Sequence, residues 1–476
     1  MSMALTLAMS TLLATATGCS KQTPGLCCTD EADCGEAGLS AVTACDDGLA
    51  CRGHQCVAEV CGSSADCNAT ALYCADQGTN RGLCAASCSD DTECPGAAQA
   101  AGDRLCVSGE CAQCRIDDDC PAGTPVCETG VCRGCVAHAE CATHVCTPNG
   151  SCATEDQIAH VAPSGASTGD CGALAPCSLS YALGSQPPHG YILFAPGTYT
   201  SAIGLTVVGK QVMIGDRGAR PVITRSTPGA ILEIGPSAEV ELDGIEVSGA
   251  TSGSEQGDGI ACRDMSSAGA ATVRLTDVLV RNNVIGVEAY TCMVIAVRTT
   301  FEANGDGAHV FDLGGSFDRC TFDSNMGMGL DEDGAVVNVT NSFFYRNWTG
   351  ISVFAFEAKP GSTFAFNTIV DNTTGIDCMT NALSPATFAN NIIARNATNI
   401  ADGTPAGYSC TYPGSIITGD VGPLRFVQPD VAPYDYHISA GSSAIDAAMA
   451  STVDHDFDGE ARPKGNGRDI GADEAK

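Results

Sequence analysis

The stretch FEANGDGAHVFDLGGSFDRCTFDSN, residues 301–325, holds one full period of the pattern that decides the fold. It starts at Phe301 and passes Asn304 and Gly307 within a few residues. The same order of residues begins again at Phe322, which is followed by Asn325 at the end of the stretch. Short segments of β-branched and aromatic residues separated by Asn and Gly turns, repeated every twenty-odd residues, are typical of a parallel β-helix.

The pattern continues on both sides of this stretch with a period of 21 to 25 residues. Each period is marked by an asparagine: Asn283, Asn304, Asn325, Asn347, Asn372 and Asn396. Three residues earlier stands an apolar residue: Val280, Phe301, Phe322, Phe344, Ile369 or Ile393. Three or four residues later stands a glycine, Gly286, Gly307, Gly329, Gly350 or Gly375, or, in the last coil, Asn399. We expect the asparagines to tolerate left-handed turns and to bond from coil to coil, and the glycines to supply positive φ. A leucine-rich repeat has a similar period, but its leucine frame is absent.

Both ends of the repeat region contain family-like motifs. His160-Val161-Ala162-Pro163-Ser164-Gly165, Cys171, Cys177 and Phe194-Ala195-Pro196-Gly197-Thr198-Tyr199 resemble the opening of pectate-lyase-like right-handed β-helix proteins. This resemblance implies a short helix over 178–184 that plugs the first coil. Near the other end, four segments resemble the choice-of-anchor Q domain: Asp435-Tyr436-His437-Ile438, Ser443-Ala444-Ile445-Asp446, Asp456-Phe457-Asp458-Gly459-Glu460-Ala461-Arg462-Pro463 and Asp469-Ile470-Gly471-Ala472-Asp473-Glu474. That second resemblance implies a mainly structural role, with Arg462 pairing Asp469 or Glu474.

Composition restricts the partners and the compartment. Acidic residues outnumber basic ones 56 to 23, which gives a formal net charge of −33. Binding to nucleic acid or to anionic lipid is therefore disfavoured. The chain has 30 cysteines, a number that favours disulfides formed in an oxidising compartment. We expect the protein to be exported.

The first residues indicate a signal peptide and a lipid anchor. Residues 4–17 form an apolar run that is too short to span a bilayer and is typical of a signal peptide. Ala16-Thr17-Gly18-Cys19 resembles the bacterial lipobox, which implies that Cys19 carries the lipid. We expect a protein anchored to a bacterial membrane by this lipid alone, at the outer membrane or cell surface; the alternative is an ordinary secretory signal with Cys19 in a disulfide.

Between residues 27 and 152 the cysteines form five modules that each open with Cys, five residues, Cys. An acidic residue always precedes the second cysteine of the opening. Such short modules cannot bury a sufficient core, so cross-links are expected to replace it. The region is similar to Dickkopf-type cysteine-rich repeats. A zinc site at Cys111, Cys114, Cys132 and Cys135 is the competing interpretation, because these pairs have the spacing of a metal knuckle.

Chemistry on the β-helix is expected in one outward column. If the residue after each glycine points inward, the next one points outward, and these are Glu288, His309, Asp331, Ser352 and Asp377. Coils lie about 4.8 Å apart, so His309 would lie between two carboxylates about 9.6 Å from each other. That separation is close to the one found in inverting glycosidases. Candidate catalytic residues are therefore Glu288, His309 and Asp331.

A second column, two residues further on, is rich in aromatic side chains. It contains Tyr290, Phe311 and Phe354, which with Asp377 form a candidate sugar-binding surface. The polygalacturonase motifs are absent, and a lyase base would have to be an arginine such as Arg263, Arg298 or Arg319. A solvated polar surface without any activity is the simpler explanation of the outward column, because outward positions on any soluble sheet are polar.

Calcium is the one cofactor that the sequence suggests, because one segment has part of a calcium-loop pattern. Asp454, Asp456 and Asp458 alternate along the chain and are followed by Gly459. The bidentate glutamate at the twelfth position of a complete loop is missing. The pattern is half a motif.

Together these observations predict an all-β chain: a right-handed parallel β-helix with an N-terminal disulfide-rich repeat region. The expected parts are a signal peptide (1–18), a lipid-anchored tether (19–26), disulfide repeats (27–152), the β-helix (153–420) and a C-terminal region (421–476). We expect a lipid-anchored cell-surface protein that binds glycans or a partner surface, such as a surface protein, with the cysteine-rich region as spacer. The alternative is a polysaccharide lyase or glycoside hydrolase that acts on acidic or plain polysaccharide.

Overall fold

The computed structural model describes 105–184, 189–253, 256–263, 269–290, 292–355, 361–380, 385–402 and 410–475, with Asp91 and four short strands before them. Those strands are β1 (Leu49–Arg52), β2 (Gln55–Ala58), β3 (Tyr73–Cys74) and β4 (Cys84–Ala85). The predicted signal peptide, Cys19 and most of the first three cysteine modules lie outside the described residues. The chain divides into two compact units, Met1–Cys152 and Ala153–Lys476. Within the described part, no helix has the length and apolar character needed to cross a membrane.

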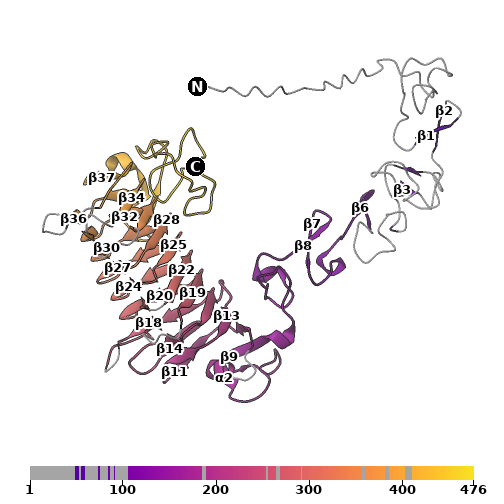
Figure 1. Cartoon of the computed structure of the whole chain (residues 1–476), viewed down its shortest axis with the longest axis horizontal. Coiled ribbons are helices and arrows are strands. Elements are labelled where there is room, and N and C mark those ends of the chain that lie inside the picture. Colours follow the sequence, from indigo (N-terminus) through magenta and orange to yellow (C-terminus); the bar gives the residue numbers. More distant parts are fainter. Residues whose placement is uncertain are drawn as a thin grey trace, which may run out of the picture. The chain divides into compact units, whose positions relative to one another are not determined.

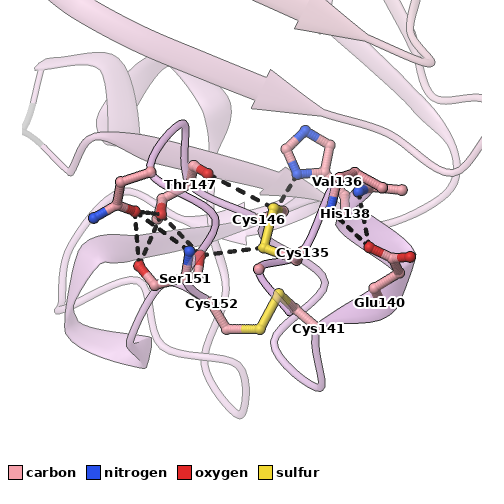
Figure 2. Close-up of a disulfide and its surroundings, with 12 residues drawn as sticks. Cys135, Val136, His138, Glu140, Cys141, Cys146, Thr147, Ser151 and Cys152 are labelled. Carbon is pink, nitrogen blue, oxygen red and sulfur yellow. Dashed lines mark hydrogen bonds between the residues drawn. A yellow bond between two sulfur atoms is a disulfide. The ribbon is translucent and has the colours of Figure 1, made fainter. Parts of the chain in front are cut away.

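The last two cysteine modules of the first unit each form a hairpin that is tied back to the segment before it. Besides β1 to β4, the described strands of this unit are β5 (Leu105–Val107), β6 (Glu110–Ala112), β7 (Val126–Glu128) and β8 (Val131–Arg133). In the last two modules the first cysteine bonds to the third and the second to the fourth. The pairs are Cys114–Cys127 and Cys120–Cys132 in one module, and Cys135–Cys146 and Cys141–Cys152 in the other (Figure 2). The third and fourth cysteines face each other across the hairpin. Cross-links thus hold together these two modules, whose buried apolar cluster in the described residues is small.

The acidic residue before the second cysteine has a local structural role. It closes a short 3-10 turn, η4 (Asp117–Asp119) or η5 (His138–Glu140), by accepting hydrogen bonds from backbone amides at the start of the module. The Glu140 carboxylate accepts a hydrogen bond of 2.7 Å from the backbone N–H of Val136. It also forms an ion pair with the Arg133 guanidinium at 2.8 Å. Hydrogen bonds from Arg133 and Val136 lower the pKa of Glu140 to about 2. The repeated acidic residue therefore fixes the turn that positions the second cysteine.

The zinc interpretation of this region is wrong. Cys114, Cys132 and Cys135 are each in a disulfide, and Cys111 is disulfide-bonded as well. A sulfur in a disulfide has no thiolate to offer a metal ion. The two-residue gap arises because the last cysteine of one module is followed closely by the first of the next.

Alkylation distinguishes these states in solution. Under denaturing, non-reducing conditions we expect peptide mapping of the described region to find label only at Cys320, the one free cysteine there. In native buffer Cys320 should not react, because burial raises the pKa of its thiol to about 12 and the side chain is inaccessible. Cys320→Ser should remove that label. Stoichiometric zinc together with extensive labelling after chelation would contradict the disulfide assignment.

The second unit is a parallel β-helix in which each complete coil contributes one strand to each of three sheets (Figure 1). The first sheet contains β9 (Ile158–Ala166), β10 (Tyr191–Phe194), β13 (Lys210–Ile214), β16 (Glu239–Asp243), β19 (Ala271–Thr276), β22 (Cys292–Val297), β25 (Gly315–Asp318), β28 (Val337–Thr340), β31 (Thr363–Ala365) and β34 (Thr387–Ala389).

The second sheet contains β11 (Thr198–Ser201), β14 (Val222–Arg225), β17 (Glu246–Ser248), β20 (Leu279–Arg281), β23 (Thr300–Glu302), β26 (Thr321–Asp323), β29 (Phe343–Tyr345), β32 (Thr368–Val370), β35 (Ile392–Ala394) and β37 (Ile416–Thr418). The third contains β12 (Leu205–Val207), β15 (Leu232–Ile234), β18 (Asp258–Cys262), β21 (Ile285–Ala289), β24 (Asp306–Phe311), β27 (Met328–Asp333), β30 (Thr349–Ala355), β33 (Thr374–Thr380) and β36 (Thr398–Asp402). The predicted fold class, an all-β right-handed parallel β-helix behind a disulfide-rich region, is confirmed.

Ladders of identical side chains fill the interior. Phe301, Phe322 and Phe344 stack with ring centroids 4.7 and 4.4 Å apart. The asparagines bond from coil to coil as predicted: the side chain of Asn325 donates to Asn347 at 2.8 Å. A second ladder, which the sequence analysis did not identify, runs through Ser342, Asn367 and Asn391 at another corner. In each ladder the side chains form hydrogen bonds with backbone N–H and C=O groups that are buried at a turn. Without these partners, burial of the backbone groups would be destabilising.

The expected role of the glycines was wrong. Left-handed φ falls instead on the residue before each asparagine, namely Asn282, Ala303, Ser324, Arg346, Asp371 and Arg395. The glycines are needed because adjacent coils approach closely. A Cβ on Gly307 would lie 2.4 Å from the carbonyl oxygen of Gly329.

The first coil and the outer face of the second sheet are covered by other parts of the chain. The short helix α2 (Leu179–Gly184), predicted over 178–184, buries Leu179 and Ala182 at the first coil, beside the Cys171–Cys177 disulfide. The C-terminal region contains β38 (Phe426–Gln428), β39 (Asp435–Ile438) and η7 (Gly422–Leu424). Its apolar residues pack on the outer face of the second sheet in a cluster that joins Phe343 and Ile392 to Tyr436 and Ile470. The β-helix and the C-terminal region thus share a core.

Candidate functional site

The predicted column lies on the outer face of the third sheet. Strand pairing places Glu288 opposite His309, His309 opposite Asp331, Asp331 opposite Ser352 and Ser352 opposite Asp377. The residues before them in each coil, Val287, Ala308, Leu330, Ile351 and Ile376, are fully buried. The five column residues therefore share one row, as the inward and outward alternation required.

Glu288 does not face solvent, contrary to expectation. Its side chain is only 1% exposed, because Arg263 from the preceding coil covers it and pairs with its carboxylate. Arg263 also pairs with the fully buried Asp258. Arg263 and its two carboxylates form a closed ionic cluster on the sheet, and neither Glu288 nor Arg263 is placed to exchange a proton with a ligand.

His309 and Asp331 remain together and partly exposed. The His309 Nε2 atom lies 3.0 Å from Asp331 Oδ2, at ion-pair distance but without the alignment of a hydrogen bond. Burial raises the pKa of Asp331, although His309 and a hydrogen bond from Ser352 lower it. The neighbouring carboxylates of Asp306 and Asp333 raise it further. Both side chains are less than one-fifth exposed, at 19% for His309 and 16% for Asp331, and the His309 Nε2 atom itself is shielded from solvent.

The aromatic column is less open than we expected. Tyr290 and Phe311 stack on each other with centroids 3.9 Å apart and planes 10° apart. His309 approaches Phe311 at the same centroid distance with a tilt of 41°. Rings that cover one another offer mainly their edges, so a flat sugar platform on Tyr290 and Phe311 is not formed. Phe354 follows two coils further on, after Asp333, and is half-buried.

Other candidates are also engaged in structural contacts. Arg298 pairs with Asp277 at 2.7 Å, and Arg319 pairs with Asp318 at 2.9 Å. Asp377 is half-buried, and burial raises its pKa. Neither arginine stands in the column, so neither is positioned as the base of a lyase.

The proposed calcium loop does not form. Asp456 is fully buried and its oxygens accept the backbone amides of Glu460 and Glu474. Asp454 is exposed and pairs with His455 at 2.8 Å. In the described part of the chain, the three carboxylates of Asp454, Asp456 and Asp458 do not converge within ligand distance of one point. The alternating aspartates serve a turn, with Asp456 as its centre.

The C-terminal region contributes a cavity that the sequence analysis did not anticipate. Its volume is about 400 Å³, and aromatic side chains from the second sheet and from the C-terminal region line it: Phe343, Tyr345, Tyr434, Tyr436 and Phe457, together with His437. The residues come from positions more than a hundred apart in the chain, so no local pattern could have indicated it.

Comparison with known proteins gives a family match for part of the β-helix. Residues 258–418 match the family model described as the right handed beta helix region. A solved pectate lyase is 17% identical, covering 67% of this chain and 96% of its own, with a TM-score of 0.44. The A-module of a mannuronan C-5 epimerase from Azotobacter vinelandii is 15% identical, covering 50% of this chain and 88% of its own, with a TM-score of 0.34. No curated protein sequence matches the chain.

Proposed function

We propose that this protein binds an uncharged glycan along the outer face of the third sheet, around His309, Phe311 and Asp331. The observation that supports this most is the row of partly exposed polar and aromatic side chains in register on successive coils. A linear polymer meets equivalent positions on each coil of such a surface, which is how solenoids form extended binding faces. Hydrogen-bonding groups beside ring edges suit sugar hydroxyls and C–H groups.

Charge favours an uncharged ligand over an acidic one. Asp306, Asp331 and Asp333 lie close enough on this face to affect one another, and the chain as a whole carries a formal charge of −33. The nearby Arg263 is already paired with Glu288 and Asp258. An acidic polysaccharide would therefore meet uncompensated repulsion.

Catalysis on a polysaccharide is the second candidate function, and the close approach of His309 and Asp331 is what favours it. A glycoside hydrolase needs two carboxyl groups that both reach the substrate. Glu288 does not meet this requirement, so a hydrolase built on Glu288 and Asp331 is not supported. A single proton transfer through His309, as in a lyase, remains compatible with the geometry.

Glycan binding is tested on arrays and by calorimetry with the purified chain. We expect binding to uncharged polysaccharides, lowered about 10-fold or more by His309→Ala or Phe311→Ala. Asp331→Asn should flatten the acid side of the binding profile, since its raised pKa makes the carboxylate protonate at a higher pH than an exposed aspartate. Met293→Ala and Asn338→Ala, at exposed positions of the first sheet, are matched controls and should bind normally.

Three results would change this proposal. Preference for acidic polysaccharides would contradict the charge argument. New reducing ends or unsaturated sugars that disappear in His309→Ala would establish the enzyme instead. Wild-type affinity in both His309→Ala and Phe311→Ala would remove the third sheet as the binding face.

We further propose that the cysteine-rich region is a spacer behind a lipid anchor at Cys19. Replacing Cys19 by Ala should move the protein from the membrane fraction to the soluble fraction, because each buried lipid methylene contributes about 0.8 kcal/mol to membrane binding. The measurement is fractionation followed by alkaline washing. Thr23→Ala is the control and should stay with the membrane; retention of Cys19→Ala would contradict the anchor.

A further inference from the structure

His437 in β39 lies at the centre of a group of carboxylates in the C-terminal region. Its Nδ1 atom lies 2.6 Å from Asp435 Oδ1, and its Nε2 atom lies 3.7 Å from Asp458 Oδ1. Ligand atoms of His437, Asp458 and Asp473 all lie within 4.8 Å of one another. These three residues come from β39, from the turn around Asp456 and from the last residues of the chain, and only folding brings them together.

The arrangement of the imidazole resembles that of a metal ligand rather than that of a bridging cation. A histidine that donates Nδ1–H to a carboxylate keeps a lone pair on Nε2, and this is the usual second-shell arrangement around metal-bound histidine. The Nε2 atom is shielded from solvent and has no hydrogen-bond partner among the described residues. The rings of Phe343 and Phe457, with centroids 5.2 and 5.8 Å from that of His437, hold the imidazole in place.

The two carboxylates are oriented and lack a basic partner. Asp473 is 6% exposed and accepts the backbone amide of Ile438 at 2.7 Å, which fixes its direction. Asp458 is 40% exposed and gives solvent access to the group. Among the ion pairs of the described residues, neither carboxylate contacts Lys or Arg within 4.0 Å. Concentrated negative charge of this kind is relieved by a cation.

We propose that His437 Nε2, Asp458 and Asp473 bind one divalent transition-metal ion, with Zn²⁺ the expected occupant and Asp435 orienting the imidazole. One imidazole nitrogen and two carboxylate oxygens fit Zn²⁺ better than Ca²⁺, which takes only oxygen ligands and more of them. Three protein ligands leave a fourth position for water or a ligand group. The ion would also join three separate segments of the C-terminal region.

The protein contains a matched control for this site. His455 also lies between carboxylates, with Nδ1 2.8 Å from Asp454 and Nε2 3.0 Å from Asp318. Both of its ring nitrogens are therefore occupied by hydrogen bonds, as in a protonated histidine. No third carboxylate joins it to form a ligand group among the described residues.

The test is calorimetric titration of the tag-free, chelator-stripped full chain with ZnCl₂, followed by metal analysis after dialysis. We expect one equivalent of zinc, at least 10-fold weaker affinity in Asp458→Asn, and a 10- to 100-fold loss in Asp435→Asn, the positioning residue. His455→Gln should bind as the unchanged protein does. Zinc should also raise the thermal unfolding midpoint, and this rise should vanish in Asp458→Asn.

Asp458→Asn alters a partly exposed side chain, so circular dichroism should show an unchanged fold and the binding result can be interpreted. Fewer than about 0.2 equivalents of zinc in the stripped chain, or equal affinity in Asp458→Asn and the unchanged protein, would overturn the proposal. Loss of zinc in His455→Gln together with retention in Asp458→Asn would place the ion elsewhere.

Discussion

Replacing Arg462 by methionine is expected to lower the free energy of unfolding by about 3–5 kcal/mol, because it leaves buried charge and buried carbonyl groups without a partner. The Arg462 and Glu474 side chains are 0% and 1% exposed and lie 2.9 Å apart. The guanidinium also donates to the carbonyl oxygens of His455, Asp469 and Gly471 at 2.8 to 3.0 Å. It further stacks over Phe366, with the guanidinium carbon 4.7 Å from the ring centroid.

The measurement is urea denaturation followed by circular dichroism, with limited proteolysis to report on the C-terminal region. Arg425→Met is the control, since Arg425 is exposed and its guanidinium has only a 3.4 Å contact to the carbonyl oxygen of Ala440. Its cost should stay within about 0.5 kcal/mol. The double variant Arg462→Met/Glu474→Leu should be less destabilised than Arg462→Met alone. A loss below about 1 kcal/mol in Arg462→Met would show that the buried pair does not hold the region together.

The β-helix was predictable because the same pattern recurs in successive coils from Asn283 to Asn396. Val280, Phe301 and Phe344 stand three residues before an asparagine, and all are fully buried in the structure. Side chains alternate across a strand, so the glycine also fixed which neighbours point outward. The pairing of Arg462 with Glu474, which the family resemblance implied, is confirmed.

The exposure of the side chains at the candidate site could not be predicted in the same way. Glu288 is outward in register, but its burial depends on Arg263, which lies at the end of the preceding coil. The asparagines that mark the repeat begin only at Asn283. The sequence therefore provided no register for the coil that contains β18, and it did not show that Arg263 would cover Glu288. The positive φ before each asparagine was missed for another reason. Residues as different as Ala303 and Arg346 occupy that position, and composition gives no signal there.

The cluster of His437 with its neighbouring carboxylates could not be predicted from the sequence, for a third reason. Asp435, His437, Asp458 and Asp473 were all within the motifs that resembled the C-terminal domain. The spacing of Asp454, Asp456 and Asp458 suggested a local ion site, yet Asp456 turned inward to bind backbone amides. Which carboxylates meet is decided by the path of the last forty residues over the second sheet, and a one-dimensional pattern does not contain that path.

Gly329→Ala is expected to destabilise the β-helix by about 2–4 kcal/mol through overpacking and loss of a ladder bond. A Cβ there would lie 2.6 Å from the carbonyl oxygen of Gly350 in the next coil and 3.3 Å from the side-chain nitrogen of Asn347. The oxygen belongs to the backbone of a paired strand, so it cannot move away without disturbing the pairing of β27 with β30.

Two other glycines separate crowding from backbone conformation. Gly334 has a φ of +67° and no atom within 4 Å of the position that a Cβ would take, so Gly334→Ala should cost only about 1–2 kcal/mol of left-handed strain. Gly419 has open space and no left-handed φ, so Gly419→Ala should be neutral or stabilising by about 0.4–1 kcal/mol. Urea midpoints of the three variants give the comparison. If Gly329→Ala lowers the free energy of unfolding no more than Gly334→Ala does, the close approach of the coils is not the reason for glycine at position 329. The backbone conformation of the turn would then be the reason.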